Sequence, residues 1–179
     1  MNKYVQSSFD LLSNIRFFNM ATHNSKEEFV WSSTLFYIPK YNSSKDCPLS
    51  LLWYSKQETR HSHELHINPR VSGTIYSSQI LPDSGLKLAG SQFIGHARQV
   101  PDEELQETYD YFFLKTYPDA NIRKKKSRPI ADYYGDAERR FYELKIEAWW
   151  VYDSTAWTDH QDDARVPVAL DDLRYPPKD

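Results

Sequence analysis

The sequence predicts a mainly β fold with flanking helices, built on an antiparallel sheet that is closed or half-closed. Aromatic residues make up 15% of the chain, with 13 Tyr, 9 Phe and 5 Trp, and side chains of this size favour the pleated faces of a sheet. Short runs rich in apolar and aromatic residues recur between polar connectors, as strands do. Gly90 and Gly95 lie within one such run, where glycine is typical of a bend or bulge that curves a sheet.

Chain length and charge limit the classes of protein to consider. The 179 residues suffice for one domain with its own core, which we place at 1–153, followed by an acidic extension at 154–179 that packs on the domain or on a partner subunit. The net charge of −3 gives no general attraction to nucleic acid or to an anionic membrane, so we expect neither as a partner.

Cys47 is the only cysteine, which excludes an intramolecular disulfide bond. No apolar run approaches the roughly 18 residues that span a bilayer, and residues 1–10 lack the apolar core of a secretory signal, so we expect a cytoplasmic protein.

The first part of the chain predicts a helix followed by a β-hairpin. Apolar residues recur with helical spacing between residues 3 and 15. Two β-leaning runs, 16–23 and 28–39, are separated by four polar residues, a connector of hairpin length. Residues 40–48 are polar and end in proline, which predicts a loop.

The stretch 49–73 predicts a strand, a short turn and the start of a helix. Residues 49–54 form an apolar run too short for a helix, and Thr59 precedes a mixed run that ends at Asn68-Pro69, so Thr59 is the predicted N-cap. The free N–H groups of the first helical turn favour a bound anion there, with Ser55, Thr59 and Arg60 as further donors. The sequence therefore predicts a phosphate site. The alternative is that Thr59 only caps the helix and that Arg60 is solvated.

Three of the six histidines lie in the same stretch and suggest a metal site, but their spacing argues against one. On a helix His61 projects about 200° from His63 and about 140° from His66, so neither pair forms a two-ligand face. His63 and His66 are adjacent on a helix, yet no cysteine or carboxylate stands at ligand spacing from them. We therefore expect no metal.

Beyond residue 70 the sequence predicts three strands, a helix and a basic segment. In order, these are strands 71–78 and 86–100 joined by a turn at 81–85, a helix at 101–117, a run of five positive charges at 123–128, and a strand at 140–152. The basic run is interpreted as a solvated loop, with a dedicated anion site as the alternative.

This order of about six strands resembles the flavin-binding split β-barrel of the pyridoxamine phosphate oxidase-like superfamily, and in particular its small uncharacterised bacterial branch. Two short motifs carry the resemblance, which spans about residues 5–152. The first comprises Tyr54-Ser55, Thr59-Arg60-His61 and Asn68-Pro69-Arg70-Val71, similar to the family's strand end, phosphate-holding turn and next strand entry. The second is LAGSQFIGHA at 88–97, which resembles the long strand with two glycines that follows.

The resemblance implies a six-stranded antiparallel split barrel that forms a homodimer and holds FMN in a groove between two barrels. It also implies the residues that contact FMN, which in this chain are Trp31, Ser32, Ser33, Thr34, Tyr54, Ser55, Thr59, Arg60 and His61. The oxidase offers Arg and Lys to the phosphate from its first flavin strand, whereas this chain offers Trp31, Ser32, Ser33 and Thr34. Hydroxyl groups and the helix N-terminus must then contribute more of the binding, which we expect to be weaker.

The leading functional hypothesis is an FMN-binding protein, and possible oxidoreductase, that acts on a small-molecule substrate. The oxidase's C-terminal arginine and histidine pattern has no match near 149–157, so vitamin B6 oxidation is not expected. Catalytic residues and substrate stay unassigned, because a redox flavin needs no side chain as acid or base. The alternatives are a non-enzymatic module that binds haem or another ligand, with His61, His63, His66 and His96 as the histidines to examine, and an RNA-binding barrel that uses the basic run.

Overall fold

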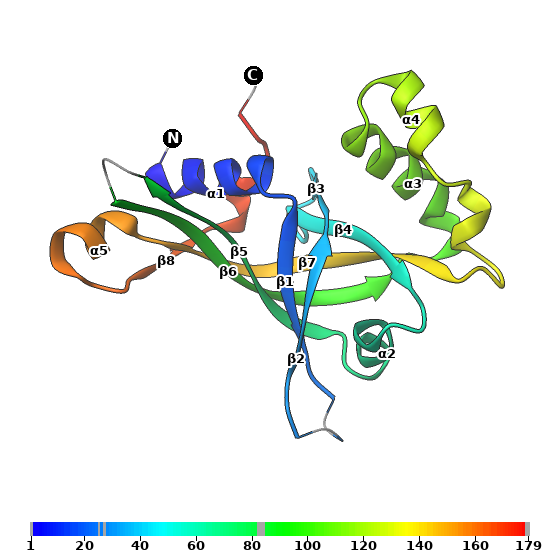
Figure 1. The fold of residues 1–179 in the computed structure, drawn as a ribbon, viewed down its shortest axis with the longest axis horizontal. Coiled ribbons are helices and arrows are strands. Elements are labelled where there is room, and N and C mark those ends of the chain that lie inside the picture. Colours follow the sequence, from blue (N-terminus) through cyan, green and yellow to red (C-terminus); the bar gives the residue numbers. More distant parts are fainter. Residues whose placement is uncertain (1, 25, 27, 82–84, 178–179) are drawn as a thin grey trace.

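An antiparallel sheet forms the body of the protein, and helices flank it (Figure 1). The computed structural model describes residues 2–24, 26, 28–81 and 85–177. The strands follow the order β2-β1-β5-β6-β7-β4-β3, and β8 pairs with β7 beside this path. Their bounds are β1 Phe17–Thr22, β2 Trp31–Phe36, β3 Ile38–Tyr41, β4 Leu49–Lys56, β5 Arg70–Leu81, β6 Gly85–Gln99, β7 Arg139–Tyr152 and β8 Arg165–Val168.

The sheet curls into a half-barrel because β2 and β3 are nearly one strand. Only Tyr37 separates them, and it is fully buried, with its amide donating to the carbonyl of Arg16 at 3.0 Å. β2 pairs with β1 at one end of the strand order and β3 pairs with β4 at the other. The predicted curved antiparallel sheet is confirmed.

The predicted count of six strands is wrong, because the described residues form a sheet of eight strands. The run 28–39, predicted as one strand, is divided at Tyr37, because the part before it pairs with β1 and the part after it pairs with β4. The second part, β3, continues to Tyr41 and so extends into the segment that was predicted to be a loop. β8 lies in the C-terminal segment, where the sequence predicts an extension rather than a strand. It pairs with the end of β7, so that Trp149 lies opposite Val168.

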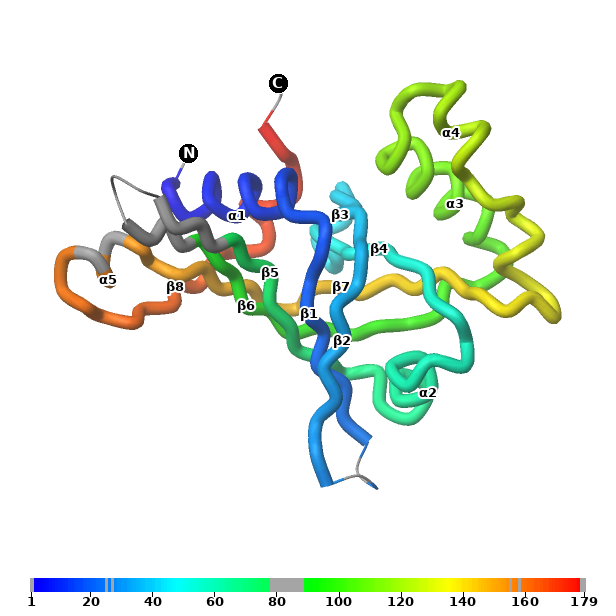
Figure 2. Tube along the Cα trace, viewed as in Figure 1, coloured from blue at the N-terminus to red at the C-terminus, as the bar shows by residue number. Residues whose placement is uncertain are grey.

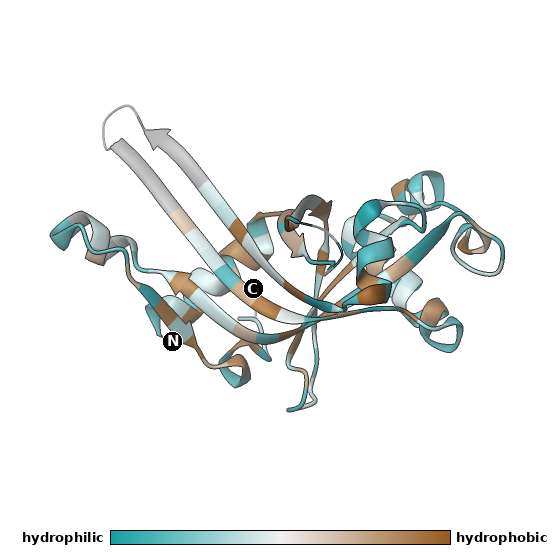
Figure 3. Cartoon of the chain, turned by 90° about the horizontal axis from the view of Figure 1, so that it is seen from below, coloured by the Kyte–Doolittle hydropathy of each residue, from teal (hydrophilic) through white to brown (hydrophobic). Residues whose placement is uncertain are grey.

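The core fills the inside of the curled sheet. Phe18, Met20, Trp53 and Trp149 are at most 1% exposed, and the indole ring of Trp53 stacks on Tyr142 with 5.4 Å between ring centroids. Inward and outward residues alternate along β1, as the period of a strand requires. In Figure 3, hydrophobic and hydrophilic residues follow one another in bands along the strands.

Two of the glycines allow close backbone approach. Pairing between β6 and β7 shifts register between Ile94 and Gly95, and a Cβ on Gly95 would lie 2.2 Å from the carbonyl oxygen of Lys145. The bulge predicted from glycine in this strand is thus confirmed at Gly95. At Gly90 a Cβ would meet its nearest neighbour at 3.6 Å, an ordinary contact. Gly73, which the sequence did not single out, approaches the carbonyl oxygen of Asn19 and the ring of Phe93.

Helices flank the sheet (Figures 1 and 2). α1, with Asn2 as its N-cap, confirms the predicted first helix, and the C-terminal 3₁₀ helix contacts it. α2 and α3 also lie where they were predicted. The bounds are α1 Lys3–Asn14, α2 Arg60–Ile67, α3 Asp102–Thr116, α4 Ala120–Lys126 and α5 Ser154–His160, with 3₁₀ helices at Ile130–Tyr133 and Leu170–Leu173.

The basic run is not a simple loop. Its first four residues form the end of α4, which is capped by the Asp119 carboxylate and has no buried residue, so no apolar face reveals it in the sequence. Arg123 Nη1 donates to the carbonyl oxygens of Tyr117 and Pro118 at the end of α3. The predicted turn at 81–85 falls largely outside the described residues.

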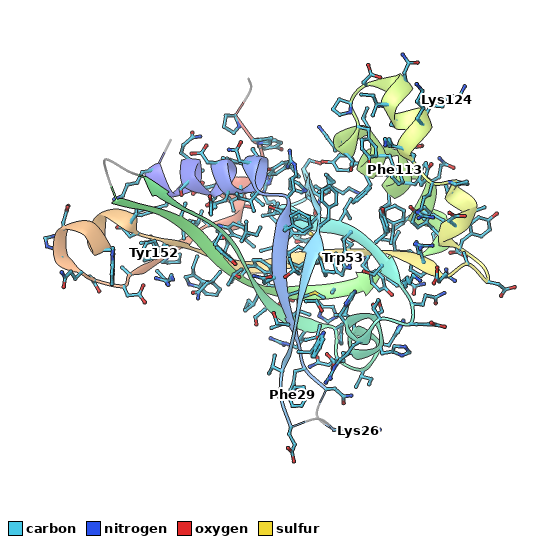
Figure 4. The ribbon with its side chains drawn as sticks, viewed as in Figure 1. Lys26, Phe29, Trp53, Phe113, Lys124 and Tyr152 are labelled. Carbon is cyan, nitrogen blue, oxygen red and sulfur yellow. The ribbon has the colours of Figure 1, made fainter. Side chains whose placement is uncertain are left out.

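An aromatic cluster fixes α3 to the outer side of the sheet. Phe112, Phe113, Tyr133 and Phe141 form a second core, separate from the inside of the half-barrel. Figure 4 shows Phe113 on α3, while Trp53 lies in the body of the sheet. None of the described helices is long and apolar enough to cross a membrane.

Candidate functional site

The N-terminus of α2 lies where β4 ends. A short turn leads from Lys56 to Thr59, whose amide donates to the carbonyl of Lys56 at 3.2 Å. In Figure 1, α2 lies below this end of the sheet and α3 and α4 stand above it. The strand, turn and helix start predicted from the sequence are therefore present.

Hydroxyl groups from three elements surround the imidazole of His61. Ser55 Oγ of β4 lies 2.8 Å from His61 Nε2, and Thr59 Oγ1 lies 3.1 Å from the same nitrogen. Ser33 Oγ of β2 lies 3.3 Å from His61 Nδ1. Ser62 Oγ adds a further contact, 2.9 Å from Thr59 Oγ1. We call Ser33, Ser55, Thr59, His61 and Ser62 the hydroxyl cluster.

The ring of His61 is uncharged at neutral pH. Burial lowers the pKa of this imidazole below its ordinary value of 6.5, and the nearby charge of Glu64 opposes the change only in part. One ring nitrogen then donates and the other accepts, so the hydroxyl groups take complementary roles. His61 orients these hydroxyl groups, and it is not a source of positive charge.

The first turn of α2 is not capped by a side chain. Thr59 is the N-cap residue, but its hydroxyl makes no hydrogen bond to the amides of the first turn. It donates instead to the carbonyl oxygen of Lys56 at 3.0 Å. The first-turn amides therefore keep their capacity to bind an acceptor, and the positive end of the helix dipole favours an anion.

Arg60 is fixed against the β1–β2 hairpin. Its guanidinium carbon lies 4.6 Å from the ring centroid of Trp31 and 5.0 Å from that of Phe29, which Figure 4 labels on this hairpin. Its Nε donates to Glu64 Oε1 at 2.8 Å, and the side chain is 32% exposed. A positive charge is therefore held in place on the first turn of α2, and part of the Arg60 side chain is accessible to a ligand.

Glu64 is the buried anchor of this arrangement. Besides Arg60, it accepts a hydrogen bond from Thr22 of β1. Burial acts to raise the pKa of its carboxyl group, but hydrogen bonds from Thr22 and Arg60 and the positive charge of Arg60 lower the pKa below its ordinary 4.5. Glu64 thus stays ionised in the folded protein.

We expect Glu64 to make stability depend on acid pH. Because its pKa is lowered by folding, its contribution to the free energy of unfolding is complete above pH 4.5 and is lost as the pH falls through the folded-state pKa. Urea denaturation of the wild type and of Glu64→Gln should show a constant difference above pH 4.5 that shrinks below it. Other carboxylates titrate in both proteins and cancel in the difference. A difference that stays constant with pH would show that folding does not lower the pKa of Glu64.

The structure brings most of the predicted cofactor residues together, but not all. Trp31, Ser33, Ser55, Thr59, Arg60 and His61 converge at the start of α2. Ser32 and Thr34 point to the other face of β2, where Thr34 Oγ1 donates to Asn19 Oδ1 at 2.6 Å. Tyr54 also lies apart, because its ring packs in the α3 cluster 5.5 Å from that of Phe112.

Ser32 belongs to a separate depression on the outer face of the sheet, which the sequence analysis missed. This outer groove has a volume of about 550 Å³, and amide, hydroxyl, indole and guanidinium groups line it. The alternation of residues along β1 and β6 is the only sequence signal for it. Its lining is Asn19, Ala21, Ser32, Ser72, Gly73, Thr74, Gln92, Phe93, Ile94, Trp150 and Arg165.

The residues at the start of α2 fit the phosphate of FMN. The free amides of the first turn and the partly exposed side chain of Arg60 can donate hydrogen bonds to a phosphate, and a serine hydroxyl that accepts from His61 keeps its own proton for the same purpose. The exposed rings of Trp31 and Phe29 offer aromatic surface beside them. Metal binding has no comparable support, since no group of three or more His, Cys, Asp or Glu side chains comes together among the described residues.

Comparison with known proteins gives the fold. No protein-family model matches the sequence, and no curated protein matches it. Among solved structures, a haem-binding protein from Mycobacterium smegmatis is 13% identical with a TM-score of 0.66, over 97% of this chain and 61% of that one. A putative pyridoxamine 5'-phosphate oxidase from Listeria innocua is 16% identical with a TM-score of 0.55, over 82% and 96%. HutZ, the haem storage protein of Vibrio cholerae, is 14% identical with a TM-score of 0.55, over 79% and 89%.

These likenesses confirm the predicted fold. The chain spans less than two thirds of the length of the Mycobacterium smegmatis protein. The protein has the split β-barrel fold of the pyridoxamine phosphate oxidase-like proteins.

Proposed function

We propose that the protein binds FMN, with the cofactor's phosphate at the N-terminus of α2. One observation carries this proposal: Ser33, Ser55 and Thr59, from β2, β4 and the N-cap of α2, bring their hydroxyl groups to one imidazole beside the uncapped turn. Arg60 adds the positive charge. Donors from separate elements converge in this way where an anion is bound.

FMN, when bound, supplies hydride or electron transfer, and the protein supplies position and electrostatics. In this proposal the hydroxyl cluster and Arg60 hold the phosphate, and Trp31 supports the cofactor from β2. No described side chain has to act as an acid or base for such chemistry. The proposal therefore extends to an oxidoreductase that acts on a small-molecule substrate in the cytoplasm.

A second copy of the chain would cover the outer groove. Phe17, Tyr76 and Ile94 are exposed apolar side chains on the same outer face as the outer groove. Apolar surface of this kind is typical of protein–protein contacts. We propose a homodimer in which this face is covered by the partner subunit.

The absorbance spectrum of the purified protein, before and after addition of FMN or haemin, tests the proposal. Flavin bands that persist through gel filtration support FMN binding. A Soret band with haemin, without retention of FMN, would favour haem instead. Failure to retain either cofactor at micromolar concentration would contradict both.

Arg60→Ala should weaken FMN binding by about 1.5–3 kcal/mol, the range for a hydrogen bond to a charged group. Because this change leaves the buried Glu64 carboxylate without its ion pair, the substitution is best made together with Glu64→Gln. Isothermal titration with FMN measures the loss. Arg70→Ala, which removes an exposed arginine beyond the end of α2, is the matched control and should bind as the wild type does. Equal FMN affinity in the two variants would show that Arg60 does not contribute to FMN binding.

Haem is the second candidate, favoured by His96. This exposed histidine lines a depression of about 690 Å³ together with Lys45 and Lys145, which could hold the propionates. Asp46, Glu147 and Asp171 line the same depression and offset that positive charge. On α2, His63 and His66 are exposed, whereas both nitrogens of His61 have hydroxyl partners. His96→Ala should abolish a Soret shift if His96 is the iron ligand.

A further inference from the structure

A third cavity lies on the side of β4 opposite to the hydroxyl cluster. Its volume is about 700 Å³, and it lies between the C-terminal end of α3 and strands β2, β3 and β4. Tyr54 lines it, while the next residue, Ser55, belongs to the hydroxyl cluster, because consecutive residues of a strand point to opposite faces. The two sites are therefore separated by the sheet, so a ligand in this cavity does not depend on flavin binding.

The walls of this cavity are aromatic. Phe36 of β2 meets Phe112 of α3 edge to face at 6.0 Å, and the ring of Tyr54 lies 5.5 Å from that of Phe112. Phe113 and Tyr117 extend the wall along α3, with nearly parallel rings 6.4 Å apart. Phe112 and Phe113 are buried, so the wall is part of a packed cluster and keeps its shape. A cavity of this size and lining suits a small apolar or aromatic molecule.

Positive charge faces this aromatic cavity from both sides. Arg16, just before β1, and Lys115, in the last turn of α3, both line it and are exposed. Arg16 Nη1 donates to the carbonyl of Leu12 at 3.3 Å, and Lys115 Nζ lies 5.7 Å from the ring centroid of Tyr111. Neither forms an ion pair with a carboxylate in the described part of the chain, and no Asp or Glu of that part lines the cavity.

The remaining polar groups also suit an anion. The hydroxyl of Tyr54 makes no hydrogen bond to any other described residue, so it can donate to a ligand. The carbonyl end of α3 would repel an anion, but Arg123 donates to the carbonyl oxygens of Tyr117 and Pro118 there. Thr116 donates its hydroxyl to the carbonyl oxygen of Phe112, so that this third carbonyl at the end of α3 also has a hydrogen-bond donor.

We propose that this cavity binds a small carboxylate with an aromatic or aliphatic body. The body packs against Phe36, Phe112 and Phe113, and the carboxylate meets Arg16 and Lys115 at the rim. A neutral molecule of the same shape gains the apolar contacts and lacks the charged ones. The cavity should therefore bind the carboxylate more tightly than the neutral molecule.

Titration calorimetry with 2-naphthoate and with the neutral 2-naphthylmethanol tests this proposal. The wild type should bind the carboxylate about tenfold more tightly than the alcohol, the effect of one charge-assisted hydrogen bond at a partly solvated site. The double variant Arg16→Gln/Lys115→Gln should lose this difference and keep its affinity for the alcohol. Both residues are exposed, so the double variant should fold. Lys124→Gln/Lys125→Gln removes the same charge from the neighbouring helix α4 and should behave as the wild type.

Thr116→Phe, which fills the cavity from α3, locates the site and should abolish binding of both compounds. Amide shifts in ¹H–¹⁵N spectra of the wild type should fall on the end of α3 and on β2–β4. The proposal is overturned by equal affinity for the two compounds, by unchanged naphthoate binding in Arg16→Gln/Lys115→Gln, by shifts confined to other elements, or by no saturable binding at millimolar concentration.

Discussion

Replacing Trp53 with alanine should lower the free energy of unfolding by about 3–5 kcal/mol, the usual loss when a large aromatic side chain is removed from a core. The indole ring is fully buried, stacks on Tyr142 at 5.4 Å and meets Phe18 edge to face at 5.7 Å. These residues come from β1, β4 and β7, so the cavity left behind would lie at the centre of the half-barrel. Urea denaturation followed by circular dichroism measures the change.

Trp157→Ala is the matched control, because Trp157 is 49% exposed. The same loss of side-chain volume there should change stability by less than about 0.5 kcal/mol. Equal destabilisation of the two variants would contradict the position of Trp53 in the core.

Gly95→Ala should destabilise the protein by about 3 kcal/mol, at the upper end for an overpacked site. The added Cβ would lie 2.2 Å from the carbonyl oxygen of Lys145 and 2.8 Å from Leu144 Cδ1. The backbone of β7, a central strand, is held by hydrogen bonds on both sides, so moving it to relieve this clash costs free energy. The pairing of β6 with β7 at the bulge would have to change. Thermal and urea unfolding report the loss.

Gly90→Ala in the same strand is the control for this prediction. A Cβ at Gly90 would make only an ordinary contact at 3.6 Å, so the substitution should be neutral within about 0.5 kcal/mol. Two equally stable variants would show that the bulge does not depend on glycine.

The elements with strong periodicity were predictable from the sequence. α1, β4 and β7 follow their apolar patterns closely, and Gly95 indicated the bulge. The division of β2 from β3 was not predictable, because it depends on which strand each half pairs with. α4 was missed because its exposed surface carries no apolar pattern.

The candidate site was predictable in part. Ser33 of β2 and Thr59 of the turn both contact His61 in the structure, whereas their contact with FMN stays a prediction. The position of Tyr54 follows from strand alternation, which separates it from Ser55. Glu64 could have been identified, because it follows Arg60 at the i, i+4 spacing of a helical ion pair. Its second partner, Thr22, comes from a distant strand and leaves no sequence signal.

The most direct test of the flavin site compares FMN with riboflavin, which differs only by the phosphate. If the hydroxyl cluster, the first turn of α2 and Arg60 hold that phosphate, calorimetry should show FMN binding at least about tenfold more tightly than riboflavin. Equal affinity for the two flavins, or no binding of either, would contradict the proposed phosphate site at the start of α2.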